Sequence, residues 1–417
     1  MNLDGIPKSA RVVIIGAGQA GAQAAISLRQ GGHEGPIAIL GEEAHPPYQR
    51  PPLSKKYLAG EWGADRLFIR PMEAWAQDGV EIAANVTAQS IDRENQRVVA
   101  ADGRSWSYDA LVLATGSRAR RLNIAGADSP KAFYLRGLDD VDAISVAAQP
   151  GRHVAILGAG YIGLEAAAML RQLGLDVTVI EQAPRALARV ASPALSAFFE
   201  REHRAQGVAF RFGDSLQAIE DPGDAKGIRL RLASGEAIAA DFIILGIGIL
   251  PNQELARAAG LACRDGVLVD AQGRSSDPQI FAIGDCARRP LPDGSGDIRL
   301  ESVHNALEQA RLAAAAILGA PAPPIEAPWF WSDQYDLKLQ MVGLSANATS
   351  HITRGDPAQR RFALYYFQDD RLIACDAVNS PPDFMAAKAM VLAGACPDPV
   401  RLADPAIPIK EFMPRKN

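Results

Sequence analysis

Cysteine is scarce in this chain of 417 residues, and its four cysteines stand far apart: Cys263, Cys286, Cys375 and Cys396. No C-x-x-C or C-x₄-C pair occurs. A disulfide framework is therefore not expected, nor is a zinc or iron–sulfur site built by this chain alone. Reduced thiols, as in the cytoplasm, are the simplest interpretation. Cys286 is expected to be a small buried residue.

Long apolar runs and an excess of basic charge are also missing. The runs at 12–15, 242–250 and 312–318 are far shorter than the roughly 20 residues that cross a bilayer. The first of them leads straight into glycines, without a signal-peptide cleavage site. The 43 Lys and Arg against 48 Asp and Glu give a net charge of −5, which argues against general binding to nucleic acids or membrane surfaces. The sequence predicts a soluble cytoplasmic protein, a monomer or weak dimer, with no nucleic-acid or membrane partner.

An internal repeat is the most informative feature that is present. RVVIIGAGQAG at 11–21 and HVAILGAGYIG at 153–163 each join a β-branched apolar run to G-x-G-x-x-G and an alanine-rich segment. Each unit then ends in a second apolar run closed by an acid, Glu42 in the first unit and Glu181 in the second. This order predicts a strand, a glycine turn, a helix and a strand, twice over, at the start of two parallel doubly wound sheets.

The glycines of each repeat suit dinucleotide binding. The first glycine permits a tight turn, the second lets the backbone approach a pyrophosphate, and the third lets the helix pack on the sheet. The helix N-terminus then favours the phosphates, and the closing acid is placed to accept ribose hydroxyl protons. An ordinary glycine-containing turn is the rival interpretation, but the full strand, helix and acid context occurs twice. The predicted binding residues are Gly16, Gly18, Gly21 and Glu42, and Gly158, Gly160, Gly163 and Glu181.

Two dinucleotide sites in one chain indicate an electron relay. Glu181 should repel a 2′-phosphate, which favours NADH over NADPH. Arg185 and Arg189 lie nearby in the sequence and could hold a phosphate, so this preference stays open.

The chain order predicts three domains. We expect a first nucleotide domain at 1–117 and 249–322, an inserted second nucleotide domain at 118–248, and a C-terminal α+β domain at 323–417. Strand-like runs end at Ala114-Thr115-Gly116 and at Gly284-Asp285, and the second of them indicates the return to the first domain. APAPPIEAP at 320–328 reads as a linker.

Blocks in the same order along nearly the whole chain resemble the FAD-dependent ferredoxin reductases of bacterial oxygenase systems, of the putidaredoxin reductase and biphenyl dioxygenase reductase type. The blocks are GAGQAG, PYQRPPLSK, LATG, GAGYIGLE, GIGILPN, IGDCA, ESVHNALEQA and PWFWSDQ. The resemblance implies FAD on the first repeat, NADH on the second, and a [2Fe–2S] ferredoxin as the electron acceptor.

The resemblance also implies roles for single residues. Lys55 would lie beside the flavin ring and pair with Glu165, as suits a cation that stabilises reduced flavin; a solvated lysine is the rival interpretation. Glu301 would lie near the nicotinamide or be an ordinary acid before a helix. Trp331 would shield the flavin or, like Trp329, belong to the core. The other implied cofactor residues are Ala20, Arg50, Val86, Ala114, Thr115, Gly116, Arg136, Gly284, Asp285, Val303, Tyr161, Ile162 and Gly248.

Rival functions of the same architecture lack support in the sequence. A disulfide reductase needs a cysteine pair beside the flavin, and a peroxidase or NADH oxidase needs a single cysteine there. This chain has RPPLSKKYL at that place. A redox-gated NADH- and FAD-binding protein of the apoptosis-inducing type remains the alternative. A ferredoxin would meet a basic patch, for which the candidates are Arg70, Arg311, Lys338 and Lys410.

Overall fold

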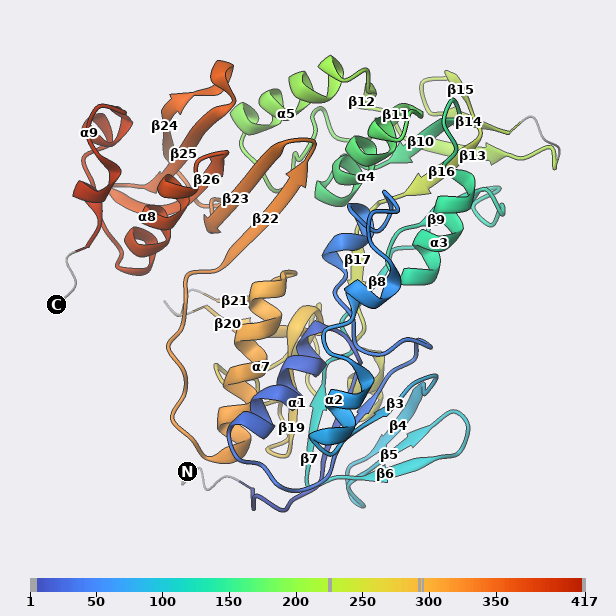
Figure 1. The fold of residues 1–417 in the computed structure, drawn as a ribbon, viewed down its shortest axis with the longest axis vertical. Helices are drawn as coiled ribbons and strands as arrows, with labels where there is room; N and C mark the ends of the chain where they lie inside the picture. Colours follow the sequence, from blue (N-terminus) through green and yellow to red (C-terminus); the bar gives the residue numbers. More distant parts are fainter. Residues whose placement is uncertain (1–5, 224–226, 292–293, 295, 415–417) are drawn as a thin grey trace. The chain divides into compact units, whose positions relative to one another are not determined.

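The computed structural model describes residues 6–223, 227–291, 294 and 296–414. The chain forms two compact units, each assembled from three segments (Figure 1). Unit 1 comprises Met1–Gln49, Asp65–Arg118 and Ile249–Glu326, and unit 2 comprises Arg50–Ala64, Ala119–Gly248 and Ala327–Asn417. The division into three domains is finer than these two units and stays a prediction.

Unit 1 is built around a parallel sheet in the order β19-β7-β1-β2-β3. Alternate residues of each strand face opposite sides, so Val12 and Ile14 join one apolar cluster, and Val13 and Ile15 join another. Burial on both faces explains why these strands read as unbroken apolar runs. The strands are β1 (Val12–Ile15), β2 (Ile37–Leu40), β3 (Val80–Ala83), β7 (Ala110–Leu113) and β19 (Ile280–Ala282).

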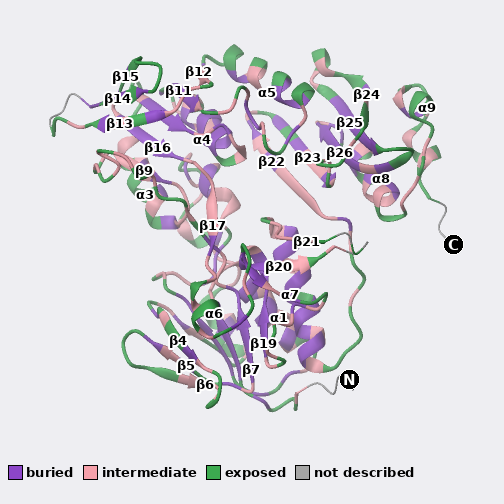
Figure 2. Cartoon of the chain, turned by 180° about the vertical axis from the view of Figure 1, so that it is seen from behind, coloured by how far each residue is buried: buried purple, intermediate pink, exposed green. Residues whose placement is uncertain are grey.

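Helices cover one face of this sheet and small elements cover the other. The cluster around Val12 and Ile14 includes α1 (Gln19–Gln30) and α7 (Val303–Leu318), which pack side by side through alanines (Figure 1). The cluster around Val13 and Ile15 includes β4 (Ala88–Asp92), β5 (Arg97–Ala100) and α6 (Glu254–Ala258). Figure 2 shows β7 and β19 buried, whereas β4, β5 and the adjoining β6 also carry exposed and half-buried residues.

The other elements of unit 1 are short. They are α2 (Met72–Gln77), β6 (Ser105–Ser107), β17 (Ile249–Pro251), β18 (Val267–Leu268), η3 (Gly284–Cys286), β20 (Ala287–Pro290) and β21 (Asp297–Ile298). Two further elements lie where the chain passes between the units, η2 (Ala64–Leu67) and β8 (Ser117–Ala119).

Unit 2 contains a second parallel sheet, in the order β12-β11-β10-β16-β9. Its strands are β9 (Ala132–Tyr134), β10 (His153–Leu157), β11 (Asp176–Glu181), β12 (Ala209–Phe212) and β16 (Phe242–Leu245). A small antiparallel sheet packs with it through a shared apolar cluster: β13 (Leu216–Glu220), β14 (Ile228–Leu232) and β15 (Ala237–Ala240). The helices of this part are η1 (Pro51–Ser54), α3 (Leu138–Ala147), α4 (Tyr161–Gln172) and α5 (Pro193–Ala205).

The C-terminal part of unit 2 is an antiparallel sheet in the order β22-β23-β26-β25-β24. Its strands are β22 (Trp329–Gln334), β23 (Leu337–Gly343), β24 (Ser350–Asp356), β25 (Arg361–Gln368) and β26 (Arg371–Val378). The helices are η4 (Pro357–Gln359), α8 (Pro381–Leu392), α9 (Pro399–Ala403) and η5 (Ile409–Phe412). Two parallel sheets and this antiparallel sheet confirm the predicted fold class. In the part of the chain that the structure describes, no helix is long and apolar enough to cross a membrane.

Candidate cofactor sites

The first glycine loop lies between β1 and α1 in unit 1. Gly16 has φ +116°, and a Cβ there would lie 2.1 Å from the Ala114 carbonyl oxygen. A Cβ on Gly21 would lie 2.0 Å from the Gly16 carbonyl oxygen. Packing within the protein therefore explains both glycines. Gly18 is different, because its backbone is extended and no heavy atom of the described residues lies within 4 Å of its Cβ position.

The second loop, between β10 and α4 in unit 2, repeats this arrangement. Cβ atoms on Gly158 and Gly163 would lie 2.3 Å and 2.1 Å from carbonyl oxygens, whereas the Cβ position of Gly160 meets no described atom within 4 Å. The backbone of Gly160 is also extended, a conformation open to any residue. The chain itself thus gives no reason for glycine at the middle position of either loop. A phosphate that must approach the backbone closely supplies that reason, so both loops fit a dinucleotide.

The helix N-termini complete each cradle. Gly18 and Gly160 are the N-cap residues of α1 and α4, and glycine has no side chain to satisfy the first N–H groups. These groups and the helix dipole are suited to bind phosphate oxygens. Ala20 and Gly21 lie in the first turn of α1, as do Tyr161 and Ile162 in α4.

The carboxyl edge of the unit 1 sheet brings together residues from distant parts of the sequence. Parallel register places Ile15 beside Leu40 and Leu113, so the residues that follow β1, β2, β7 and β19 emerge at the same edge. The predicted cofactor residues that follow these strands are Gly16, Glu42, Ala114, Thr115, Gly116, Gly284 and Asp285. Ligands of open α/β sheets bind at this edge.

Hydrogen bonds hold this edge in shape. Ser117 Oγ donates to Asp285 Oδ2 at 2.8 Å. Asn252 Nδ2 donates to the Thr115 carbonyl oxygen at 2.9 Å, and its backbone N–H donates to Gly116. The motifs pointed to Thr115, Gly116 and Asp285 but not to the roles of Ser117 and Asn252. Cys286 is fully buried beside Asp285, as predicted for a structural residue.

The other predicted cofactor residues of unit 1 are placed by their backbone or by single hydrogen bonds. The Val86 N–H donates to the Gly41 carbonyl oxygen at 2.7 Å, and Glu42 itself is exposed. Val303 opens α7 behind its N-cap, Ser302. Glu301 Oε1 accepts from Arg299 at 2.5 Å. Its predicted place near the nicotinamide stays a prediction.

In unit 2, Glu181 binds backbone N–H groups of the second glycine loop and of its own loop. Its Oε2 accepts from the Ala159 N–H and its Oε1 from the Ala183 N–H, each at 2.8 Å. A carboxylate has about four acceptor positions, so ribose hydroxyls could still bind. Arg185 donates to backbone oxygens of its own loop and to Ser196, which occupies its guanidinium. Arg189 is exposed, and its Nη2 lies 3.7 Å from the Cβ position of Gly248.

Lys55 and Glu165 form an ion pair inside unit 2. Lys55 Nζ lies 2.6 Å from Glu165 Oε2, and the side chains are 16% and 2% exposed. Ser54 Oγ donates to the same carboxylate oxygen at 2.6 Å, and Ser332 Oγ donates to Oε1 at 2.7 Å. The rival interpretation of Lys55 as a solvated lysine is therefore wrong. Neither serine was predicted, although both lie inside the diagnostic RPPLSK and FWSDQ blocks.

Further predicted residues of unit 2 also meet. Arg50 Nη1 donates to the Arg136 carbonyl oxygen at 2.9 Å. The rings of Tyr161 and Phe330 are 5.2 Å apart, and those of Phe330 and Trp331 are 6.2 Å apart. The Tyr161 hydroxyl donates to Met341 Sδ at 2.9 Å, and burial raises the pKa of Tyr161, so that hydroxyl stays protonated. An aromatic row thus leads from the second glycine loop to β22.

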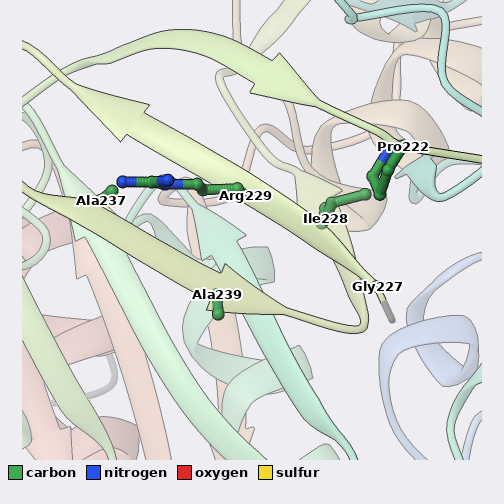
Figure 3. Close-up of a pocket in the computed structure, with 6 residues that line it drawn as sticks. All are labelled: Pro222, Gly227, Ile228, Arg229, Ala237 and Ala239. Atoms are coloured by element: carbon green, nitrogen blue, oxygen red, sulfur yellow. The ribbon is translucent and has the colours of Figure 1, made fainter. Parts of the chain in front are cut away.

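A shallow hollow of about 320 Å³ lies on the small antiparallel sheet of unit 2 (Figure 3). Two exposed alanines of β15 and the Arg229 side chain line it, together with Pro222, Gly227 and Ile228. None of these residues belongs to a glycine loop or to the Lys55 pair, so we assign it no part in cofactor binding.

Two family models match most of the chain. Residues 10–310 match the family model described as pyridine nucleotide-disulphide oxidoreductase, and residues 329–413 match the model described as reductase C-terminal. The chain is 44% identical to the 5,5′-dehydrodivanillate O-demethylase ferredoxin reductase subunit of a Sphingobium species, over 96% of this chain and 97% of that protein. It is 41% identical to putidaredoxin reductase of Pseudomonas putida, over 96% of each.

A solved structure extends this likeness to the fold. The structure of the covalent putidaredoxin reductase–putidaredoxin complex matches with a TM-score of 0.94 and 40% identity, covering 97% of this chain and 98% of that one.

Proposed function

This chain belongs to the pyridine nucleotide-disulphide oxidoreductase family, and on that premise we propose that it passes electrons from NADH through FAD to a [2Fe–2S] ferredoxin that serves an oxygenase. The family match and the relatives confirm the predicted resemblance to ferredoxin reductases and both cofactors. One structural observation carries the proposal: two glycine loops whose middle glycine is needed only by a ligand. We place the reaction in the cytoplasm.

Although the family is named for disulphide chemistry, this chain lacks the residues for it. Its first cysteine is Cys263, so the RPPLSK block contains none. Lys55 occupies that block instead, held by Glu165. A cation there suits electron transfer, because it stabilises negative charge on a reduced flavin.

The proposed mechanism assigns binding and orientation to the chain. FAD, when bound, accepts a hydride and returns single electrons. The loop at Gly18 and the edge at Asp285 would hold it, with contacts from Arg50, Val86, Arg136 and Val303. The loop at Gly160 and the Glu181 carboxylate would hold NADH. Lys55 would keep a positive charge beside the flavin ring, oriented by Glu165, and Trp331 would exclude water from it.

The docking surface for the ferredoxin is part of the proposal. Of the four predicted cations, Arg70 is held by Asp78 at 2.6 Å and is less available to a partner. Arg311, Lys338 and Lys410 are exposed.

Mixing the purified flavoprotein with NADH in a stopped-flow instrument tests the function. We expect rapid bleaching of the flavin band, then reduction of an added oxidised [2Fe–2S] ferredoxin, with NADPH at least roughly tenfold slower. A flavin that NADH reduces but that passes no electrons to ferredoxin would favour the redox-gated binding protein of the apoptosis-inducing type. A protein that binds no flavin on reconstitution would overturn the proposal.

Replacing Glu181 with glutamine tests the coenzyme preference. The change removes a negative charge that should repel a 2′-phosphate, so the NADPH-to-NADH ratio of kcat/KM should rise by roughly tenfold. The kcat/KM for NADH should fall, because the amide cannot accept from both Ala159 and Ala183. Glu236→Gln, which alters an exposed pair with Arg211, is the matched control. An unchanged ratio would remove Glu181 from the coenzyme site.

A further inference from the structure

We propose that Ser332, held by Gln334 and His203, is a positioning residue for the Lys55–Glu165 pair and thereby tunes the bound flavin. This inference deepens the proposed function and rests on it, because Lys55 is assigned to the flavin by that proposal. The hydrogen-bond network itself lies entirely within unit 2.

A buried carboxylate needs a donor on each oxygen, because an unsatisfied charged atom is costly away from water. Glu165 is 2% exposed. Its Oε2 accepts from Ser54 and Lys55, both at 2.6 Å, and its Oε1 accepts from Ser332 at 2.7 Å. Ser332 is thus the donor to Oε1, the carboxylate oxygen that does not bind Lys55.

The direction of the Ser332 hydroxyl is set by the residue two positions along β22. Side chains two apart on a strand share a face, and Ser332 and Gln334 are both buried. Gln334 Nε2 donates to Ser332 Oγ at 3.2 Å. Because a hydroxyl has a single proton, the Ser332 proton is left for Glu165.

His203 on α5 sets the orientation of Gln334 in turn. His203 Nε2 lies 2.7 Å from Gln334 Oε1, and the Tyr335 hydroxyl lies 3.2 Å from His203 Nδ1. An amide oxygen only accepts, so Nε2 must carry the ring proton, and Nδ1 accepts from Tyr335. Burial lowers the pKa of His203 to about 4, so the ring is neutral at neutral pH. The hydrogen bonds therefore run in one direction: Tyr335 donates to His203, and each later group donates to the next one until Ser332 donates to Glu165.

This network orients the carboxylate and does not conduct protons. A glutamine amide cannot pass a proton from His203 to Ser332 without becoming an unfavourable tautomer. The network instead ties three separate elements, α4, α5 and β22, to one carboxylate orientation. Without the Ser332 hydroxyl, Glu165 keeps only donors on Oε2 and can rotate. Lys55 would then hold its charge at a less defined position.

Ser332→Ala in the FAD-loaded enzyme tests the inference by two readouts. We expect flavin reduction at saturating NADH to slow by roughly tenfold, with the Kd for NADH unchanged. We also expect a lower midpoint potential of the bound flavin, measured by spectroelectrochemistry, because a less localised cation stabilises reduced flavin less. Ser332→Thr retains the hydroxyl and should restore both values toward those of the wild type. Ser350→Ala, at an exposed serine of β24, is the matched control and should change neither.

A third measurement does not depend on the flavin. ¹⁵N-histidine NMR of the wild-type protein should show His203 as the neutral Nε2–H tautomer at pH 5 to 8. An Nδ1–H tautomer, or a Ser332→Ala potential equal to that of the wild type, would overturn the inference. A wild-type enzyme that NADH cannot reduce would instead refute the proposed function. The tautomer of His203 would then still test the hydrogen-bond network.

Discussion

Gly18→Val is expected to weaken FAD binding by more than about 100-fold and to leave the stability of the apoprotein within about 1 kcal/mol of the wild type. Gly18 has an extended backbone, and its Cβ position meets no described atom within 4 Å. The protein therefore has room for a Cβ atom at this position, and a valine side chain built on it would occupy the space that a phosphate needs. Flavin titration of the apoprotein measures the first effect, and thermal unfolding measures the second.

Gly16→Ala supplies the contrast within the same loop. Its φ of +116° is strained for any other residue, and the new methyl would lie 2.1 Å from the Ala114 carbonyl oxygen. This change should destabilise the apoprotein itself by at least about 1–3 kcal/mol. If Gly18→Val bound FAD normally, the loop would not be a pyrophosphate site. If both variants unfolded alike, the distinction between the two glycines would be wrong.

The stability of the Asp376→Asn variant relative to the wild type is expected to rise with pH. Asp376 lies on β26, is 6% exposed, and accepts a hydrogen bond from the Tyr366 hydroxyl at 2.7 Å. Burial raises the pKa of Asp376 to about 7, from an ordinary value of 3.8. The folded protein thus binds a proton that the unfolded chain has released, so the contribution of Asp376 to stability is present below pH 3.8 and lost as pH rises toward 7.

Asparagine does not titrate, so the variant avoids this loss. Its stability relative to the wild type should grow between pH 4 and pH 8 by at most about 4 kcal/mol. Urea unfolding at several pH values measures the difference. Asp370→Asn, at an exposed position on the same hairpin, should show no such trend. A pH-independent difference for Asp376→Asn would mean that its carboxyl group titrates normally.

Local patterns made much of this molecule predictable. Each glycine loop with its strands, helix and closing acid lies within about 35 residues, so one stretch of sequence contains the whole pattern. By contrast, Ser332 meets Glu165 across 167 positions, and Ser54 meets it across 111. A serine gives no periodic signal, so such contacts need the fold.

Some of the missed residues had a weak signal. Ser332 and Gln334 lie two positions apart in the polar second half of β22, so they share one face of the strand. Their partner His203 lies on a helix more than a hundred residues earlier, and nothing in the sequence relates the two segments. Asn252 likewise follows a conspicuous motif, but its bonds to Thr115 and Gly116 depend on the sheet order.

The interleaved segments of the two units have a consequence for biosynthesis. Strand β19, which pairs with β7, and helix α7, which packs on α1, come from the segment after residue 248. While the chain emerges from the ribosome, β7 keeps an open edge and α1 an uncovered apolar side until that segment has been made. Unit 1 cannot complete its core before that segment is made, so a nascent chain exposes aggregation-prone surface until then. A fragment that ends at Arg118 would keep that surface exposed permanently, and chaperone assistance should matter more for this protein than its size suggests.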